Sequence, residues 1–215
     1  MKAIELGVTS VTIYRLEVRP DQPLMADFLK SPQSFPNEQA CLEMRCSAKR
    51  LLEQAGYQEN LIGWFLKDQA ADTVVYRERW QNQSPCVAFG PGVHNYGADH
   101  FYYNFTDQLA YIDSVSEGIH PTEGVIMMGP QEQMVWFVMC QLKSKAKVSR
   151  FEVERRYGVE NEKRLEEWTK PLQEMGLLIG NEEGVKLSEE GSCVLEWCIQ
   201  DLLEQLKGWR CASGR

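Results

Sequence analysis

The chain has 215 residues and a mass of 24.7 kDa, enough for one large domain or two small ones with a core that needs no disulfides. Apolar residues make up 43% and charged residues 25%, which excludes disorder, collagen-like repeats and low complexity. A formal net charge of -8 disfavours nucleic acid and anionic lipid as partners. No apolar stretch is long enough to span a bilayer, and the first residues lack the apolar region of a signal peptide.

The cysteines point to a reduced environment. There are 7 of them, at positions 41, 46, 86, 140, 193, 198 and 211. The number is odd and most lie inside apolar periodic segments, so we expect a soluble cytoplasmic protein. The pairs at 41/46 and 193/198 are five residues apart on predicted helices and point in different directions. We therefore expect buried thiols and no metal ligation.

The first part of the chain predicts strand, helix and strand. Residues 8–18 are rich in β-branched residues and predict a strand that ends before two prolines. Asn37 can cap a helix that Gly56 ends, and residues 61–66 predict a second strand. The predicted inward face of that helix is Met44, Ala48, Leu51 and Ala55. This order is typical of a βαβ unit with a parallel sheet.

Two parallel strands are not stable alone, so we expect the chain to enter a longer α/β fold part-way through. The alternative is a small α+β sheet completed by later strands. An incomplete barrel would leave an unpaired edge near residues 11–18, which predicts association of the isolated chain.

The middle of the chain predicts a long loop followed by one helix. Periodicity fades over residues 68–104, and long loops often carry function. Thr106 can cap a helix that reaches Val115 and ends at Gly118. Residues 121–129 are expected to link onward, with a domain boundary near residue 120.

The last part predicts helices around one hairpin. Helices are expected at residues 131–142, 150–157 and 160–175, a hairpin at 177–179 and 185–187, and a final helix from Ser188. This order is winged-helix-like, which usually suggests DNA binding. The mixed charges of helix 160–175 favour a structural or docking role instead.

Four stretches in this order resemble the carboxy-terminal half of the oxygen-independent coproporphyrinogen III oxidase family, which are radical S-adenosylmethionine (SAM) proteins of haem metabolism. The first is residues 3–7 (AIELG) leading into 11–16 (VTIYRL), and the second is 51–57 (LLEQAGY). The third is 88–94 (AFGPGVH), which is followed by Tyr103, Asn104 and a helix at 109–112. The fourth is 185–191 (VKLSEEG). The resemblance implies the late part of a partial (β/α) barrel over residues 1–120 and a mainly helical, winged-helix-like domain over residues 121–210.

The resemblance also implies cofactors that this chain lacks the motif to bind. The family holds a [4Fe–4S] cluster through a C-x-x-x-C-x-x-C run, and the open iron site binds S-adenosylmethionine. No such run occurs here, and the family's early glycine-rich segment is also missing. We therefore expect no complete cofactor site in this chain alone, and it stays open whether the chain is itself an enzyme.

The resemblance places four residues near the cofactor: Arg15, Gly90, Gly92 and His94. The Gly-Pro-Gly turn would allow close approach of the backbone to a ligand, although an ordinary tight turn is the alternative. His94 is expected to line a pocket in preference to ligating a metal.

The resemblance also places a substrate side near Trp64, Tyr76, Arg77, Arg79 and Trp80. Of these we select Tyr76, Arg79 and Trp80 as substrate-binding, because arginine can pair with porphyrin propionates. Tyr76 replaces the family's usual asparagine, which favours the haem-utilisation or chaperone-like branches over coproporphyrinogen decarboxylation. Further flat surfaces are offered by Tyr96, His100, Phe101, Tyr102, Tyr103 and Phe105, with a hydrophobic plug between the domains as the alternative.

Two hypotheses follow. In the first, the chain is the carboxy-terminal part of a radical SAM protein acting on porphyrin or haem, and it needs an amino-terminal half for activity. In the second, it is a stand-alone tetrapyrrole-binding or protein-docking module without radical chemistry.

Overall fold

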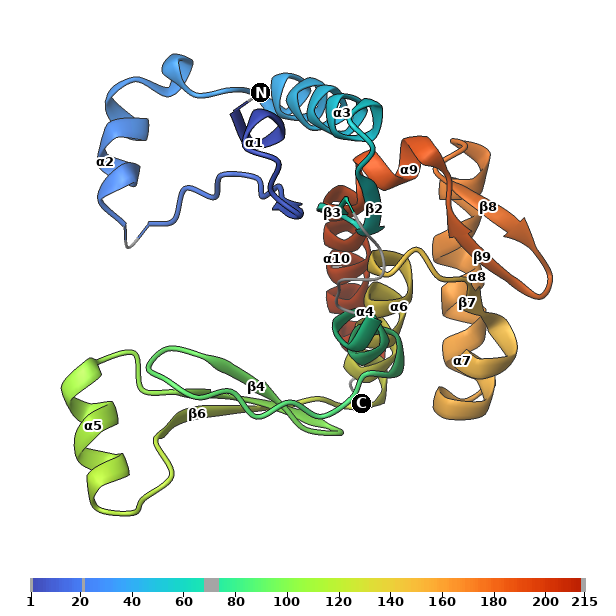
Figure 1. Ribbon diagram of the computed structural model, residues 1–215. Helices are drawn as coiled ribbons and strands as arrows, with labels where there is room; N and C mark the ends of the chain where they lie inside the picture. Colours follow the sequence, from blue (N-terminus) through green and yellow to red (C-terminus); the bar gives the residue numbers. More distant parts are fainter. Residues whose placement is uncertain (1, 21, 68–73, 214–215) are drawn as a thin grey trace.

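The computed structural model describes residues 2–20, 22–67 and 74–213, with only the backbone path described at 74–77 and 206–213 (Figure 1). The first part of the chain contains α1 (Lys2–Glu5), β1 (Ser10–Thr12), α2 (Pro23–Lys30), the 3-10 turn η1 (Pro32–Ser34), α3 (Glu38–Gln54), β2 (Gln58–Leu61) and β3 (Trp64–Leu66). Asn37 caps α3 by accepting the N–H of Ala40 at 2.9 Å, as predicted.

The first sheet is antiparallel, with the order β1-β3-β2, so the predicted parallel βαβ unit is wrong. Residues 61–66, expected to form one strand, contain the turn at Ile62 and Gly63 that joins β2 to β3. Such a short connection can only join antiparallel neighbours. Of the predicted strand 8–18, Ser10–Thr12 form β1 and Thr9 and Ile13 add one backbone hydrogen bond each, whereas Tyr14 and Leu16 beyond them are 82% and 61% exposed.

The inward face of α3 also differs from the predicted one. Leu52 is fully buried and forms a small core with Tyr57 and Phe65. Met44 and Leu51, both expected inside, are exposed. Lys49 is buried in their place, because it reaches a buried carboxylate that the apolar pattern does not reveal.

The middle of the chain forms a projecting arm, not the predicted loop (Figure 1). Helix α4 (Val74–Asn82) lies beside α6 (Pro130–Lys143), and the arm that follows it consists of β4 (His94–Tyr96), β5 (His100–Asn104), α5 (Gln108–Ser116) and β6 (Thr122–Met127). The strands form an antiparallel sheet in the order β4-β5-β6. The predicted link at 121–129 is therefore mostly strand, and Asp107 caps α5 instead of Thr106. The division near residue 120 stays a prediction; β5 and β6 pair across it.

The last part follows the predicted order closely. It contains α6 (Pro130–Lys143), β7 (Val148–Ser149), α7 (Arg150–Tyr157), α8 (Val159–Glu174), β8 (Leu178–Asn181), β9 (Gly184–Leu187), α9 (Glu189–Cys193) and α10 (Leu195–Ser213). A third sheet has the order β7-β9-β8. Ser188 caps a helix as expected, but this helix ends at Cys193 and α10 follows it.

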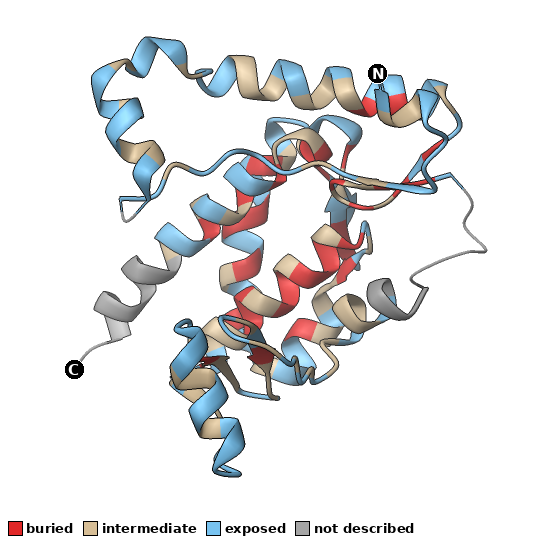
Figure 2. Ribbon diagram, turned by 60° about the vertical axis from the view of Figure 1, so that its left-hand side comes forward, coloured by how far each residue is buried: buried red, intermediate tan, exposed pale blue. Residues whose placement is uncertain are grey.

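The main core lies among these helices, where Figure 2 shows most of the buried residues. It includes Met134, Val138 and Leu142 of α6, and Leu165, Trp168 and Leu172 of α8. Burial of each large side chain contributes about 1.5–3 kcal/mol, so this core is the main source of stability. The α/β class is confirmed, but the described residues form small antiparallel sheets and no closed barrel.

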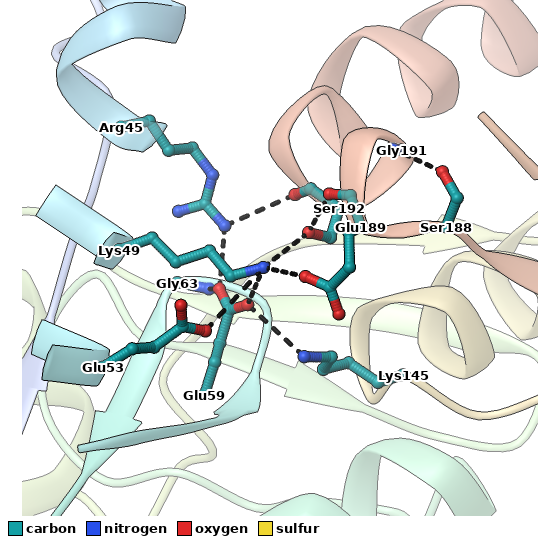
Figure 3. A network of polar contacts seen from close by, with 10 residues as sticks. All are labelled: Arg45, Lys49, Glu53, Glu59, Gly63, Lys145, Ser188, Glu189, Gly191 and Ser192. Carbon is teal, nitrogen blue, oxygen red and sulfur yellow. Dashed lines mark hydrogen bonds and ion pairs between the residues drawn. The ribbon is translucent and has the colours of Figure 1, made fainter. Parts of the chain in front are cut away.

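A fully buried carboxylate joins the first sheet to the last part of the chain (Figure 3). Glu59 Oε1 accepts from Arg45 Nη2 at 2.9 Å and from the N–H of Gly63 at 2.8 Å. Its Oε2 lies 3.8 Å from Lys49 Nζ and 3.6 Å from Lys145 Nζ. Arg45 and Lys49 come from α3, whereas Lys145 follows α6.

Lys49 extends this network to α9. Its ammonium contacts the Glu189 carboxylate and donates to Ser192 Oγ at 3.2 Å. Burial acts to lower the pKa of Lys49, but the contacts with Glu189 and Glu59 outweigh it, so the pKa lies above its usual range. Lys49 therefore stays charged at neutral pH and keeps α3 paired with α9.

We predict that Glu59→Gln lowers the free energy of unfolding by about 3–5 kcal/mol, because three cations lose their shared counter-charge in a buried site. Chemical denaturation monitored by circular dichroism measures the change. Glu167→Gln, the same substitution on the exposed side of α8, is the matched control and should change stability by less than about 0.5 kcal/mol. Equal effects of the two variants would contradict a structural role for the network.

Candidate functional site

Four rings meet where the arm joins α6, and we call them the aromatic cluster: Trp80, Tyr96, Phe101 and Trp136. The Trp136 ring lies 5.3 Å from Trp80, 5.6 Å from Tyr96 and 4.9 Å from Phe101, measured between ring centroids. Tyr96 and Phe101 are opposite one another in the β4–β5 pair. The cluster therefore fixes one face of the arm against α6 and α4.

The same sheet face continues away from the cluster. His94 lies two residues from Tyr96 on β4, so both side chains occupy one face. His94 is opposite Tyr103, and their ring centroids are 6.1 Å apart. Tyr103 lies across Gly124 of β6, where a Cβ would collide with its ring. Rings thus line this face from Trp136 to His94.

Two cations lie over rings of the cluster. Arg79 Cζ is 5.7 Å from the Tyr96 centroid, and its Nη1 donates to Cys86 Sγ at 2.9 Å. Lys143 Nζ is 4.6 Å from the Trp80 centroid. Burial lowers the pKa of Lys143, although Cys140 acts against this shift. The cluster therefore carries positive charge within an acidic protein.

The turn that precedes β4 is held by internal hydrogen bonds. Asn95 is fully buried, and its Oδ1 accepts from the N–H of Ala88 at 2.6 Å. Asn104 Nδ2 donates to the Gly90 carbonyl at 2.9 Å. The N–H of Gly90 donates to Tyr111 Oη, also at 2.9 Å. These bonds fix the turn against β5 and α5.

The structure brings together only some of the predicted site residues. Arg79 and Trp80 lie at the aromatic cluster, and His94 lies further along the same sheet face. Arg15 is elsewhere, in a bidentate pair with Glu38 at the start of α3. The side chain of Tyr76 is outside the described residues.

The predicted set of aromatic residues is divided between two sheet faces. Tyr96, Phe101 and Tyr103 share the face described above. Tyr102 occupies the opposite face, where its ring lies between those of His100 and His120, with centroids 6.0 and 5.4 Å away. A single pocket lined by all of them is therefore not formed.

Sequence reasoning missed Trp136 and Asn95, whereas the burial of Cys140 agrees with the expected buried thiols. Trp136 looked like part of an apolar helix face, and only the sheet pairing shows its role. Asn95 could have been noticed as a polar residue between aromatic positions. Burial raises the pKa of Cys140 to about 12, so this thiol is protonated and unreactive at neutral pH.

The residues present do not fit the family's cofactors. Among the described residues, no group of three or more His, Cys, Asp or Glu side chains could hold a metal ion. The N–H groups of Gly90 and Gly92 already donate to Tyr111 and to the Phe105 carbonyl. The cavity beside Arg79 and Trp80 has a volume of only about 10 Å³, room for about one water molecule.

Comparison with known proteins identifies the fold. No model of a known family and no curated protein matches the chain. Among solved structures, it is similar to coproporphyrinogen III oxidase (HemN) from Escherichia coli, described as a radical SAM enzyme, with a TM-score of 0.70 and 16% identity. The match covers 94% of this chain and 49% of that enzyme. The chain thus spans about half the length of HemN and has the fold of that half, as the resemblance predicted.

We predict that Trp136→Ala loosens the arm, because three ring contacts worth about 0.5–1.5 kcal/mol each are lost. Amide hydrogen exchange in β4 and β5 should become about ten- to a hundredfold faster than in the parent chain. Trp197→Ala, which removes a half-exposed ring from α10, should leave exchange in these strands unchanged. Unaltered exchange in Trp136→Ala would show that the cluster does not hold the arm.

Proposed function

We propose that the chain acts as the carboxy-terminal half of a coproporphyrinogen oxidase-like radical SAM protein that handles porphyrin or haem. Its fold match to one half of HemN carries the proposal. The iron–sulfur cluster and S-adenosylmethionine are then supplied through an amino-terminal half, and the chain is inactive alone. We place this protein in the cytoplasm; in the part of the chain that the structure describes, no helix is long and apolar enough to cross a membrane.

The sheet face at the aromatic cluster supports a tetrapyrrole as the ligand. His94 and Tyr103 extend the cluster as flat aromatic surfaces that suit a planar macrocycle. Arg79 lies beside Tyr96 and presents a guanidinium that suits a propionate carboxylate. Because the cavity there is small, the ligand would lie on this face or open the contact between α4 and β4.

The exposed apolar residues of the arm support a partner surface. On α5, Leu109, Ile112 and Val115 are between 50% and 71% exposed, and no residue of this helix is buried. Contiguous exposed apolar surface often marks an interaction site. We propose that the amino-terminal half covers it, and that the winged-helix-like order from α6 to β9 serves docking and not DNA binding.

The second candidate is a stand-alone tetrapyrrole-binding module, close to a haem chaperone. The observation that favours it is the ring-lined sheet face, which presents flat surfaces without any contribution from an iron–sulfur cluster. In this case the chain binds its ligand without radical chemistry.

We predict that anaerobic incubation of the chain with iron and sulfide gives no stable [4Fe–4S] absorbance, because among the residues that the structure describes no three or more His, Cys, Asp or Glu side chains are grouped so that they could hold a metal ion. The chain incubated with iron and sulfide should also fail to oxidise coproporphyrinogen. Absorption spectroscopy and iron analysis measure the outcome. A stable cluster on this chain alone would contradict both candidate functions.

We predict saturable one-to-one binding of haemin or protoporphyrin, followed by absorbance and tryptophan quenching. His94→Ala and Arg79→Ala should each raise Kd about tenfold, since each removes one ligand contact. His120→Ala on the opposite face and Arg50→Ala on the exposed side of α3 are matched controls that should leave Kd unchanged.

Binding weakened equally by all four variants would be non-specific and would refute a site on this face. Binding by the parent chain alone, together with failure of cluster assembly, is compatible with either candidate. Adding the amino-terminal half then discriminates between the two candidate functions, because coproporphyrinogen oxidation should appear only under the first.

A further inference from the structure

Strand β6 forms an outer edge of the arm sheet. Among the residues that the structure describes, β6 pairs with β5 alone, because the sheet order is β4-β5-β6 (Figure 1). In an antiparallel sheet, about half of the N–H and C=O groups of an edge strand point away from its neighbour. Strand β6 therefore presents a row of backbone hydrogen-bonding groups with which a further strand can pair.

The side chains of this edge are apolar on both faces of the sheet. Val125, Ile126 and Met127 are 55%, 57% and 66% exposed, respectively. Ile126 lies on the same face as Phe101, its opposite residue in β5, whereas Val125 and Met127 lie on the other face. An edge strand that faces only water commonly carries a charged side chain or a proline at such positions. These three residues are neither, which favours an edge that a partner covers.

The charge on β6 does not oppose pairing with a second copy. Glu123 is its charged residue, and the Glu123 Oε2 atom accepts from the N–H of Thr106 at 3.0 Å and from Thr106 Oγ1 at 3.1 Å. Like charges directly opposite one another in an antiparallel pair are destabilising. If two β6 strands pair about Val125, each Glu123 lies opposite Met127 of the other copy, so the two carboxylates do not meet.

We propose that β6 is a homodimer interface, in which this edge pairs antiparallel with the same edge of a second copy of the chain. A two-fold axis at Val125 makes the interface self-complementary, because the same surface is used by both copies. Gly124 then lies opposite Ile126 of the second copy. The two three-stranded arm sheets become one continuous sheet, with the ring-lined faces of both copies on the same side.

Gly124 gives the second copy a ring to pack against. A Cβ at this position would collide with the ring of Tyr103, which lies across the glycine. Ile126 of the second copy lies beside that ring, since opposite residues in a strand pair share a face. Cross-strand contacts between aromatic and β-branched side chains contribute about 0.2–1 kcal/mol each. The contact is made twice, because each copy supplies both the ring and the isoleucine.

The test is the mass of the full-length chain, measured by size-exclusion chromatography with light scattering over a series of concentrations. We expect twice the 24.7 kDa of one chain at high concentration and the mass of one chain on dilution. Amide hydrogen exchange locates the contact, because residues 124–127 should exchange about tenfold more slowly at the high concentration than at the low one.

Val125→Lys places two ammonium groups opposite one another at the two-fold axis. This variant should have the mass of one chain where the parent is a dimer, and circular dichroism should show an unchanged fold because Val125 is half-exposed. Leu109→Lys is the matched control. It makes the same change of charge on α5, at a side chain that is 71% exposed, and should keep the dimer.

A parent chain that is monomeric at every concentration would overturn the proposal and leave this edge to a different partner, such as the amino-terminal half. A dimer that Val125→Lys preserves, or that Leu109→Lys abolishes, would also overturn it, because the contact would then lie outside β6. None of these results depends on tetrapyrrole binding, which the haemin titration tests separately.

Discussion

The buried carboxylate of Glu59 is the constraint on which the arrangement of the chain depends. Moving one carboxylate out of water costs several kcal/mol unless charged partners and hydrogen bonds replace the water. Here the replacements come from Arg45, Lys49, Lys145 and the Gly63 N–H. No single segment supplies all of them. Glu59 Oε1 accepts hydrogen bonds, and Oε2 faces two ammonium groups at 3.6 and 3.8 Å without a hydrogen bond from any described residue. These partners meet only when α3, the β2–β3 turn and the end of α6 are assembled together, which selects one docking geometry.

Helix α6 connects this constraint to the candidate site. Its inner face supplies Met134, Val138 and Leu142 to the main core. The carbonyl of Lys143 accepts the N–H of Ile62 from the β2–β3 turn at 2.8 Å. Trp136, on another side of the helix, packs against the rings of the arm. The first sheet and the arm are therefore both positioned against one rigid helix, so a shift in either is resisted by the same core.

Local signals in the sequence found most of the longer helices but missed α2 and α4, and they were insufficient for the sheets. Asn37 and Ser188 predicted helix starts correctly, because a cap needs only a side chain and the N–H groups that follow it. Strand direction is a non-local property, and the turn at Ile62 and Gly63 is concealed within an apolar run. Lys49 is buried only because Glu59 lies nearby, which no periodicity shows. For the site, Arg79 and Trp80 were expected to lie together, whereas Trp136 required the tertiary packing.

The groups that the resemblance assigns to a cofactor differ in how easily they could leave their present partners to contact one. The Arg15 pair with Glu38 is largely exposed, with the two side chains 42% and 80% accessible, so separating it costs no more than about 1 kcal/mol. The Gly90 N–H donates to Tyr111, and the Gly90 carbonyl is also engaged by Asn104. Freeing this turn would break several bonds at once. The Gly90 turn therefore resists a change of partner more strongly than Arg15 does, because the bonds of the turn are internal and the Arg15 pair is exposed to solvent.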